Sequence, residues 1–389
     1  MFSLLLAIIY LIFVSLGLPD AVLGSAWPVM FQDLNVPLDY MGYIQIIISA
    51  GTIISSLLAT KLINKMGTAK LTLGSVFLTA IALFGFAYTP SYGFLLLAAL
   101  PYGLGAGAID AALNNYVALH FESSHMSWLH SMWGVGASLG PLIMAYALAR
   151  PMSWSGGYAI LAIIQVIITF IIFLSLPLWQ ENKESTEEET ENEFTELSLK
   201  DLPKVPGAIS MLITFFSYTA LENTVGLWAS SYFVIAKGVS ESSAAAWASL
   251  YYIGLTVGRM INGFLTYRFK DKELVRGGIL LIAVALFIVI VSTHNVLILI
   301  GFILMGLGCA PIYPSVIHSV PDFFGLEKSQ SIVSYGMASA NLGILLTPAL
   351  FGLIARYISI KLFPVYLALI LLLMYLGHKN ASKKTLKEA

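Results

Sequence analysis

Long apolar stretches alternate with short polar connections from one end of the chain to the other. Each stretch holds about 20 residues or more, enough for a helix to cross the hydrocarbon core of a bilayer. The pattern therefore predicts an all-α membrane protein with twelve transmembrane helices. They are expected over residues 3–31, 41–63, 70–89, 92–118, 127–149, 156–179, 207–236, 243–267, 276–293, 295–319, 329–355 and 359–378.

One segment breaks this pattern, because residues 180–206 are strongly polar and contain eight glutamates. Such a composition predicts a solvated linker rather than a packed element. The linker divides the spans six from six, so we expect two six-helix bundles around a central cavity. The predicted domains are an N-terminal bundle over 1–179, the acidic cytoplasmic linker, a C-terminal bundle over 207–378 and a cytoplasmic tail over 379–389.

Composition agrees with a membrane protein and argues against other classes. Hydrophobic residues make up 58% of the chain and charged residues 11%, whereas soluble domains carry roughly 25% charged residues. The net charge of −1 argues against nucleic acid as a partner. The single cysteine, Cys309, excludes an internal disulfide and a thiolate metal site. No phosphate-binding G-x-x-x-x-G-K-S/T motif and no recognisable catalytic nucleophile occur, so we expect no ATPase, no other enzyme and no cofactor.

The distribution of lysine and arginine predicts the orientation in the membrane. If both termini are cytoplasmic, fifteen of the 20 basic residues lie inside, four lie outside and Arg259 lies within the membrane. Such an excess on the inside is typical of cytoplasmic loops. We therefore expect a multi-pass protein of the inner (plasma) membrane with cytoplasmic termini, its first span running from the start of the chain with no cleaved signal.

Four charged side chains lie away from the ends of the predicted spans, namely Asp20, Asp110, Glu222 and Arg259. A central Asp, Lys or Arg costs about 2.5–3.5 kcal/mol on insertion scales, so we expect the four to face the cavity rather than lipid. Burial away from water favours the neutral form of a carboxylate, which can bring proton exchange into the physiological range. The three carboxylates are therefore candidates for coupling solute movement to a proton gradient, with sodium coupling as the alternative.

The fourth span brings small and polar residues together. Gly103 and Gly107 lie four residues apart and predict a face on which another helix packs closely. Asp110 and Asn114 also lie four apart, so they share a face and, with the neighbouring Asn115, could present a carboxylate and amides to a solute. The alternative is that Asp110 only holds helices together.

The seventh span offers the groups that carbohydrate recognition needs. Glu222, Asn223 and Trp228 combine hydrogen-bond acceptors, an amide and an aromatic face. A hydroxyl-rich ligand needs directional hydrogen bonds together with stacking on a ring. The alternative for Glu222 is a clamp between two helices.

Further polar and aromatic side chains in the spans are candidates for the same cavity. His130 and Trp133 lie in the fifth span, Tyr313 in the tenth and Asn341 in the eleventh. Imidazole can donate, accept or titrate near neutral pH, and Tyr and Trp offer a ring with a polar tip. For His130, Tyr313 and Asn341, helix packing alone is the alternative.

Proline predicts where spans are interrupted. Pro19 precedes Asp20 and, with Gly24, could loosen the first span, so Asp20 is a candidate for proton coupling or binding, with a structural role as the alternative. Pro311 and Pro314 are expected to break the hydrogen-bond ladder of the tenth span and to expose carbonyl groups.

Basic residues near the inner surface are candidates for gating. Arg259 needs an anionic or carbonyl partner, which is either an intramembrane carboxylate or a group at a cytoplasmic gate. Lys65 and Arg268 stand at matching places, each five residues after a small residue at the end of the second and eighth spans.

This repeat, with the twelve spans and the acidic midpoint, resembles the major facilitator superfamily. The run from Gly103 to Asn114 and the run from Phe215 to Tyr232 are similar to the fourth and seventh spans of the fucose–proton symporters, a sugar carrier family. The resemblance implies two pseudo-symmetric halves related by an axis along the membrane normal. It also implies a monomer, and for a fourth-span carboxylate such as Asp110 it implies proton coupling or sugar binding.

The sequence thus predicts a secondary active transporter that moves a small hydroxylated solute, a sugar, with protons by alternating access. Efflux of drugs or amphipathic lipids by proton antiport is the alternative. A membrane receptor without transport is a third, although no sizeable soluble domain would carry its signal.

Overall fold

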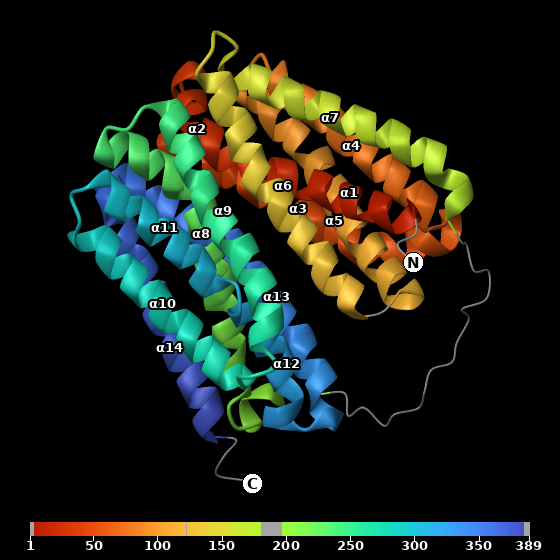
Figure 1. The fold of residues 1–389 in the computed structure, drawn as a ribbon, viewed down its shortest axis with the longest axis vertical. Coiled ribbons are helices and arrows are strands. Elements are labelled where there is room, and N and C mark those ends of the chain that lie inside the picture. The colour runs from red at the N-terminus through yellow and green to blue at the C-terminus, as the bar shows by residue number, and fades with distance from the viewer. Residues whose placement is uncertain (1–3, 122, 180–196, 385–389) are drawn as a thin grey trace. The chain divides into compact units, whose positions relative to one another are not determined.

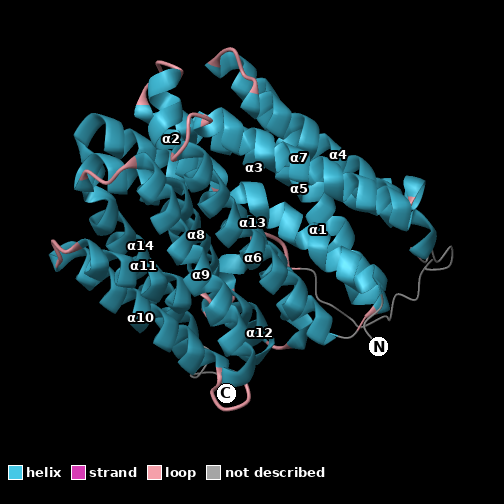
Figure 2. Cartoon of the chain, turned by 45° about the horizontal axis from the view of Figure 1, so that its top comes forward, coloured by secondary structure: helices cyan, strands magenta, loops and turns pink. Residues whose placement is uncertain are grey.

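The computed structural model describes residues 4–121, 123–179 and 197–384. Throughout these ranges the chain forms helices joined by loops, without a strand (Figures 1 and 2). The helices are α1 (Leu4–Asp20), α2 (Val22–Asp33), η1 (Leu38–Tyr40), α3 (Met41–Met66), α4 (Thr68–Ala87), α5 (Tyr92–His120), α6 (Ser123–Leu148), α7 (Ser153–Ser175), η2 (Leu176–Leu178), η3 (Leu202–Lys204), α8 (Ala208–Lys237), α9 (Glu241–Leu265), α10 (Asp271–Val291), α11 (Asn295–Cys309), α12 (Ile312–Phe324), α13 (Leu326–Ile354), η4 (Ala355–Ser359), η5 (Ile360–Leu362) and α14 (Phe363–Lys384).

Each of the twelve predicted spans is present as helix within the described residues. The first span is made of α1 and α2, and the tenth is made of α11 and α12. In the described part of the chain, nine helical stretches are long and apolar enough to cross a membrane, and one of these contains both α13 and α14. The spans outside this set are α8 and α9, the helices that carry Glu222 and Arg259. Polar residues inside a span lower its mean hydropathy, so a criterion based on hydropathy leaves out the two helices that carry these charges.

The chain divides into two compact units. Unit 1 contains Met1–Lys183, Gly226–Ile253 and Gly352–Lys361, and unit 2 contains Glu184–Val225, Gly254–Phe351 and Leu362–Ala389. Within unit 1, α5 packs on α3 and α4, α1 packs on α6, and α7 packs on α4; within unit 2, α10 packs on α11, α12 and α14. The predicted domain boundaries at 179, 206 and 378 stay a prediction. Most of the predicted linker, residues 180–196, and the end of the tail, residues 385–389, lie outside the described residues.

Glycines allow α1 and α6 to approach very closely. A side-chain carbon at Gly17 would collide with the carbonyl oxygen of Trp133, and one at Gly140 would collide with the carbonyl oxygen of Leu18. Small residues at a helix interface permit this kind of backbone contact in membranes. The contact holds the backbone at Trp133 next to the end of α1, where Asp20 lies.

The predicted close-packing face of the fourth span is confirmed. Gly103 and Gly107 in α5 lie against the carbonyl groups of Ile48 and Thr52 in α3. The Thr52 hydroxyl also donates a hydrogen bond to the Gly103 carbonyl oxygen at 3.2 Å. This packing fixes α5, and with it the side of the helix that carries Asp110.

Proline interrupts two spans, as predicted for Pro19 and Pro311. Pro19 has no N–H, so the carbonyl group of Ser15 lacks its usual helical partner. The Gln165 side chain of α7 replaces that partner, because its Nε2 donates to the Ser15 oxygen at 2.6 Å. The tenth span breaks at Ala310 and Pro311, between α11 and α12. Pro314, in the first turn of α12, likewise has no N–H to donate to the Ala310 carbonyl group, so both prolines interrupt the hydrogen-bond ladder at this break, as predicted.

Candidate transport site

Asp20 ends α1 and is held by two neutral hydrogen-bond donors. The Tyr102 hydroxyl of α5 donates to Asp20 Oδ1 at 2.6 Å, and the Trp133 indole Nε1 of α6 donates to Oδ2 at 2.8 Å. Tyr102 is buried, whereas Asp20 itself is exposed. Both carboxylate oxygens are therefore fixed in position while the group stays accessible.

Asp110 lies in the same unit and carries its own amide partner. Asn114 Nδ2 donates to Asp110 Oδ1 and to the Asp110 carbonyl oxygen, each at 2.9 Å. The two residues thus share a face of α5, as their spacing predicts. Tyr102, two turns earlier in α5, donates to Asp20, so α1 and α5 bring two carboxylates into one region. Asn115 is exposed.

Aromatic rings border this region in unit 1. The Trp133 ring lies 6.5 Å from the ring of Tyr252 in α9, in an edge-to-face arrangement. Gly226 of α8 makes room for Tyr252, because a side-chain carbon there would collide with the Tyr252 hydroxyl. One turn before Trp133, His130 is exposed and its ring meets Phe13 edge-on at 5.8 Å.

Unit 2 holds a second carboxylate, which pairs with a cation. Arg259 Nη2 of α9 donates to Glu222 Oε1 of α8 at 3.3 Å, and the side chains are only 20% and 14% exposed. Of the two alternatives for Arg259, the structure thus shows the pair with an intramembrane carboxylate. The Tyr218 side chain lies beside both charges. It stacks on the ring of Tyr313 in α12 at 5.4 Å.

Three further predicted residues, Asn223, Trp228 and Asn341, lie on α8 and α13. Asn223 Nδ2 donates to the Thr219 carbonyl oxygen of its own helix at 3.0 Å. Trp228 is completely buried, with its ring against Gly352. Asn341 of α13 is exposed.

The two predicted gating residues lie at helix ends. Lys65 is exposed in the last turn of α3, and Arg268 is exposed between α9 and α10. The backbone N–H of Arg268 donates to the Leu265 carbonyl oxygen at 3.0 Å. Lys65 therefore lies within its helix, whereas Arg268 lies three residues past the end of α9, and a gating role for both stays a prediction.

Sequence reasoning missed three tyrosines, Tyr102, Tyr218 and Tyr252. Tyrosines are common in membrane helices, and nothing in the spacing of these three distinguishes them from packing residues. Tyr102 lies two turns before Asp110 in the same helix, so a search for hydroxyl groups near intramembrane carboxylates would have found it. The meeting of Tyr252 with Trp133 joins α9 to α6, which no local spacing predicts.

The chain belongs to the Major Facilitator Superfamily, whose family profile matches residues 9–245 and 210–389. It is 24% identical to "Bypass of stop codon protein 6" of Saccharomyces cerevisiae, over 91% of this chain and 78% of the relative. It is 22% identical to the "Glucose/mannose transporter GlcP" of Bacillus subtilis, over 86% of this chain and 84% of the relative. The solved structure of the nucleoside transporter NupG matches with a TM-score of 0.76 and 14% identity, over 98% of this chain and all of that one.

The protein is therefore a multi-pass membrane transporter and not an enzyme. The superfamily fold has twelve helices in two six-helix bundles. This fold agrees with the spans found along the chain.

Proposed function

We propose that this protein is a secondary active transporter that couples the movement of a small hydroxylated solute, a sugar, to protons. One observation carries the proposal: Asp20 is accessible, lies within a membrane span, and is held by neutral donors near a second carboxylate, Asp110. Surroundings less polar than bulk water favour the neutral form of a carboxylate, which brings its proton exchange closer to neutral pH. Such a group can carry a proton through the transport cycle.

The solute would bind beside these carboxylates. Trp133 and Asn114 offer a ring and an amide in unit 1, and Tyr313 and Asn223 offer a ring and an amide in unit 2. Hydroxylated rings are recognised by this combination. Two similar proteins carry the names of a glucose/mannose transporter and a nucleoside transporter, and both of those solutes are rich in hydroxyl groups. Trp228 contributes packing in this proposal, because its ring is completely buried.

The remaining parts of the proposal concern the transport cycle. Asp20 and Asp110 exchange the transported proton, and protonation of Glu222 opens its pair with Arg259. The excess of basic residues on one side supports cytoplasmic termini and a cytoplasmic linker in the plasma membrane. The cavity opens alternately to each side as the two halves rock, and the transporter works as a monomer.

Uptake into proteoliposomes tests the coupling. Purified protein is given labelled glucose, fucose or uridine under an imposed proton gradient, a sodium gradient or no gradient. We expect accumulation with the proton gradient alone, and its loss in Asp110→Asn. Asp33→Asn is the matched control, since Asp33 is an exposed carboxylate at the end of α2 that accepts a hydrogen bond from Trp154.

Three results would contradict the proposal. Uptake that ignores the proton gradient, with Asp110→Asn unimpaired, removes the proton coupling. Accumulation driven by a sodium gradient would show that sodium, and not the proton, is the coupling ion. Export of a fluorescent drug against the proton gradient, without sugar uptake, favours the antiport alternative.

A further inference from the structure

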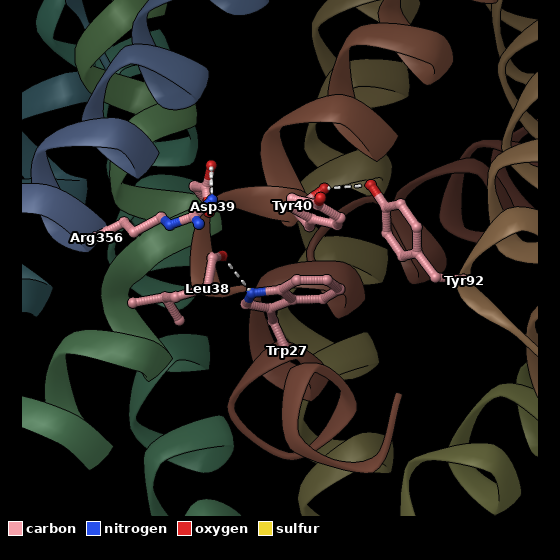
Figure 3. Close-up of polar contacts among 6 residues, drawn as sticks. All are labelled: Trp27, Leu38, Asp39, Tyr40, Tyr92 and Arg356. Carbon is pink, nitrogen blue, oxygen red and sulfur yellow. Dashed lines mark hydrogen bonds and ion pairs between the residues drawn. The ribbon is translucent and has the colours of Figure 1, made fainter. Parts of the chain in front are cut away.

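An ion pair with a buried carboxylate joins two parts of unit 1 that lie 317 residues apart in the sequence. Arg356 Nη1 donates to both oxygens of Asp39, at 3.0 and 3.3 Å (Figure 3). The Asp39 side chain is 3% exposed and that of Arg356 is 35% exposed. Asp39 lies between the first two spans and Arg356 follows the eleventh, so the pair joins the two halves of the chain.

Two hydrogen bonds fix the backbone on the Asp39 side. Trp27 Nε1 of α2 donates to the Leu38 carbonyl oxygen at 2.8 Å, and the Tyr92 hydroxyl of α5 donates to the Tyr40 carbonyl oxygen at 2.8 Å (Figure 3). These bonds hold the residues on either side of Asp39 in the short helix η1. Contacts within the first half of the chain therefore position the carboxylate.

The backbone around Arg356 packs against the helix that carries Asp39. Arg356 lies in η4, a single π-helical turn that follows α13, and η4 packs against η1. Such π turns are rare and are frequent at functional sites. Gly352, one turn earlier, fits closely on this side: a side-chain carbon there would lie 3.0 Å from the Trp228 ring, which is tight, and 3.4 Å from the Asp39 Cα, which is an ordinary contact.

A second contact in unit 1 joins the same halves of the chain. Gly24 of α2 lies against the backbone of α8, because a side-chain carbon there would come within 2.5 Å of the Gly226 carbonyl oxygen. The close contact of α2 with α8 and the ion pair of η1 with η4 thus both join the first half of the chain to the second.

We propose that the Asp39–Arg356 pair is a latch that holds the outer entrance of the transporter closed and opens once in each cycle. The proposal rests on the proposed function for two points, alternating access and the orientation that puts both residues outside. In that orientation the connection before the second span and the connection after the eleventh face the exterior. Any outward opening that separates the two halves has to break this pair.

The energetics of this ion pair suit a reversible latch. Asp39 is removed from water and Arg356 only in part, and the desolvation of the carboxylate offsets much of the attraction between the two charges. Removing Arg356, in contrast, leaves the buried Asp39 charge without compensation. The closed state therefore depends on both charges, while opening returns Asp39 to water at small net cost. A latch with this balance holds without trapping the transporter.

Distance measurements between spin labels test the latch without any transported solute. Cysteines replace Tyr88 and Ile358, which are 73% and 72% exposed, in a Cys309→Ser background. The test variants are Asp39→Asn, Arg356→Gln and the charge swap Asp39→Arg with Arg356→Asp. The matched controls are Asp33→Asn, a carboxylate bound within the first half, and Lys361→Gln, an exposed cation on the same connection as Arg356.

We expect each neutralising variant to raise the ratio of long to short distances about tenfold, equivalent to about 1.4 kcal/mol. The charge swap should restore the short distance, and both controls should keep it. Thermal unfolding of each labelled protein verifies that it is folded. If one neutral variant does not fold, the charge swap is compared with the other neutral variant instead.

Two results overturn the latch. Distances that stay unchanged in both neutral variants show that the pair does not hold the closed state. Equal lengthening in the controls shows a general loosening instead. Because the readout needs neither solute nor gradient, the latch can fail while sugar uptake stands, and it can hold while the sugar proposal fails.

Discussion

Two carboxylate centres, one in each compact unit, satisfy their charges in opposite ways. In unit 1, Asp20 accepts hydrogen bonds from the neutral donors Tyr102 and Trp133. In unit 2, Glu222 pairs with the Arg259 cation. Among the residues that the structure describes, the salt bridges include neither Asp20 nor Asp110.

The difference separates two uses of an intramembrane acid. Within the described structure no cation forms a salt bridge with Asp20, so adding a proton to Asp20 leaves no partner charge unbalanced. A proton added to Glu222 removes the counter-charge that it gives to Arg259, and this cost is large where water is scarce. The first centre therefore suits a proton carrier, and the second suits a clamp that protonation of Glu222 opens when another group compensates Arg259.

The largest expected effect separates transport from folding at Asp20. Asp20→Asn should abolish proton-driven accumulation while leaving solute exchange and thermal stability close to those of the parent. The amide keeps an acceptor for Trp133 and a partner for Tyr102 but exchanges no proton. Counterflow and gradient-driven uptake in the same vesicles measure both activities. Accumulation that survives in this variant would move the coupling away from Asp20.

The ion pair in unit 2 should respond in the opposite sense. Arg259→Ala leaves Glu222 without its cation and should lower the free energy of unfolding by about 3 kcal/mol. The double variant Glu222→Gln with Arg259→Gln should lie within about 1 kcal/mol of the parent, because no unbalanced charge remains. Denaturant unfolding in detergent measures all three proteins. If Asp20→Asn proved as destabilising as Arg259→Ala, the contrast between the centres would be wrong.

What the sequence could predict followed from local chemistry. The spans, the close-packing face at Gly103 and Gly107, and the pairing of Asp110 with Asn114 each depend on spacing within one helix. The partners of Asp20 and of Asp39 could not be predicted, because they lie 82 and 113 residues from Asp20 and 317 residues from Asp39. Rules based on residue spacing apply within one helix and do not predict contacts between residues so far apart in the sequence, which only the folded structure brings together.

The approach of α6 to α1 should matter less than the ion pair but still measurably. Gly136→Ala puts a side-chain carbon against the Val14 carbonyl oxygen, and overpacking of this kind costs about 2 kcal/mol. It should also weaken solute binding, because α6 carries Trp133 to Asp20. Gly74→Ala is the control, since an added carbon there meets open space in α4 and should be stabilising by about 0.5 kcal/mol. Equal stability of both variants would mean that α6 can shift without cost.

The smallest effect isolates a single hydroxyl beside Asp20. Tyr102→Phe removes the 2.6 Å hydrogen bond to Oδ1 and should cost about 1 kcal/mol, because the carboxylate loses the bond from a buried hydroxyl. Tyr158→Phe is a matched control in α7: its hydroxyl is buried and makes no hydrogen bond within the described residues. Its removal should change stability by less than about 0.5 kcal/mol, since no bond is lost. Unfolding of both variants, with and without Asp20→Asn, gives the coupling between Tyr102 and Asp20 directly. If the loss at Tyr102 were the same in the Asp20→Asn background, the phenol would act on packing alone, and Asp20 would depend on Trp133 for its position.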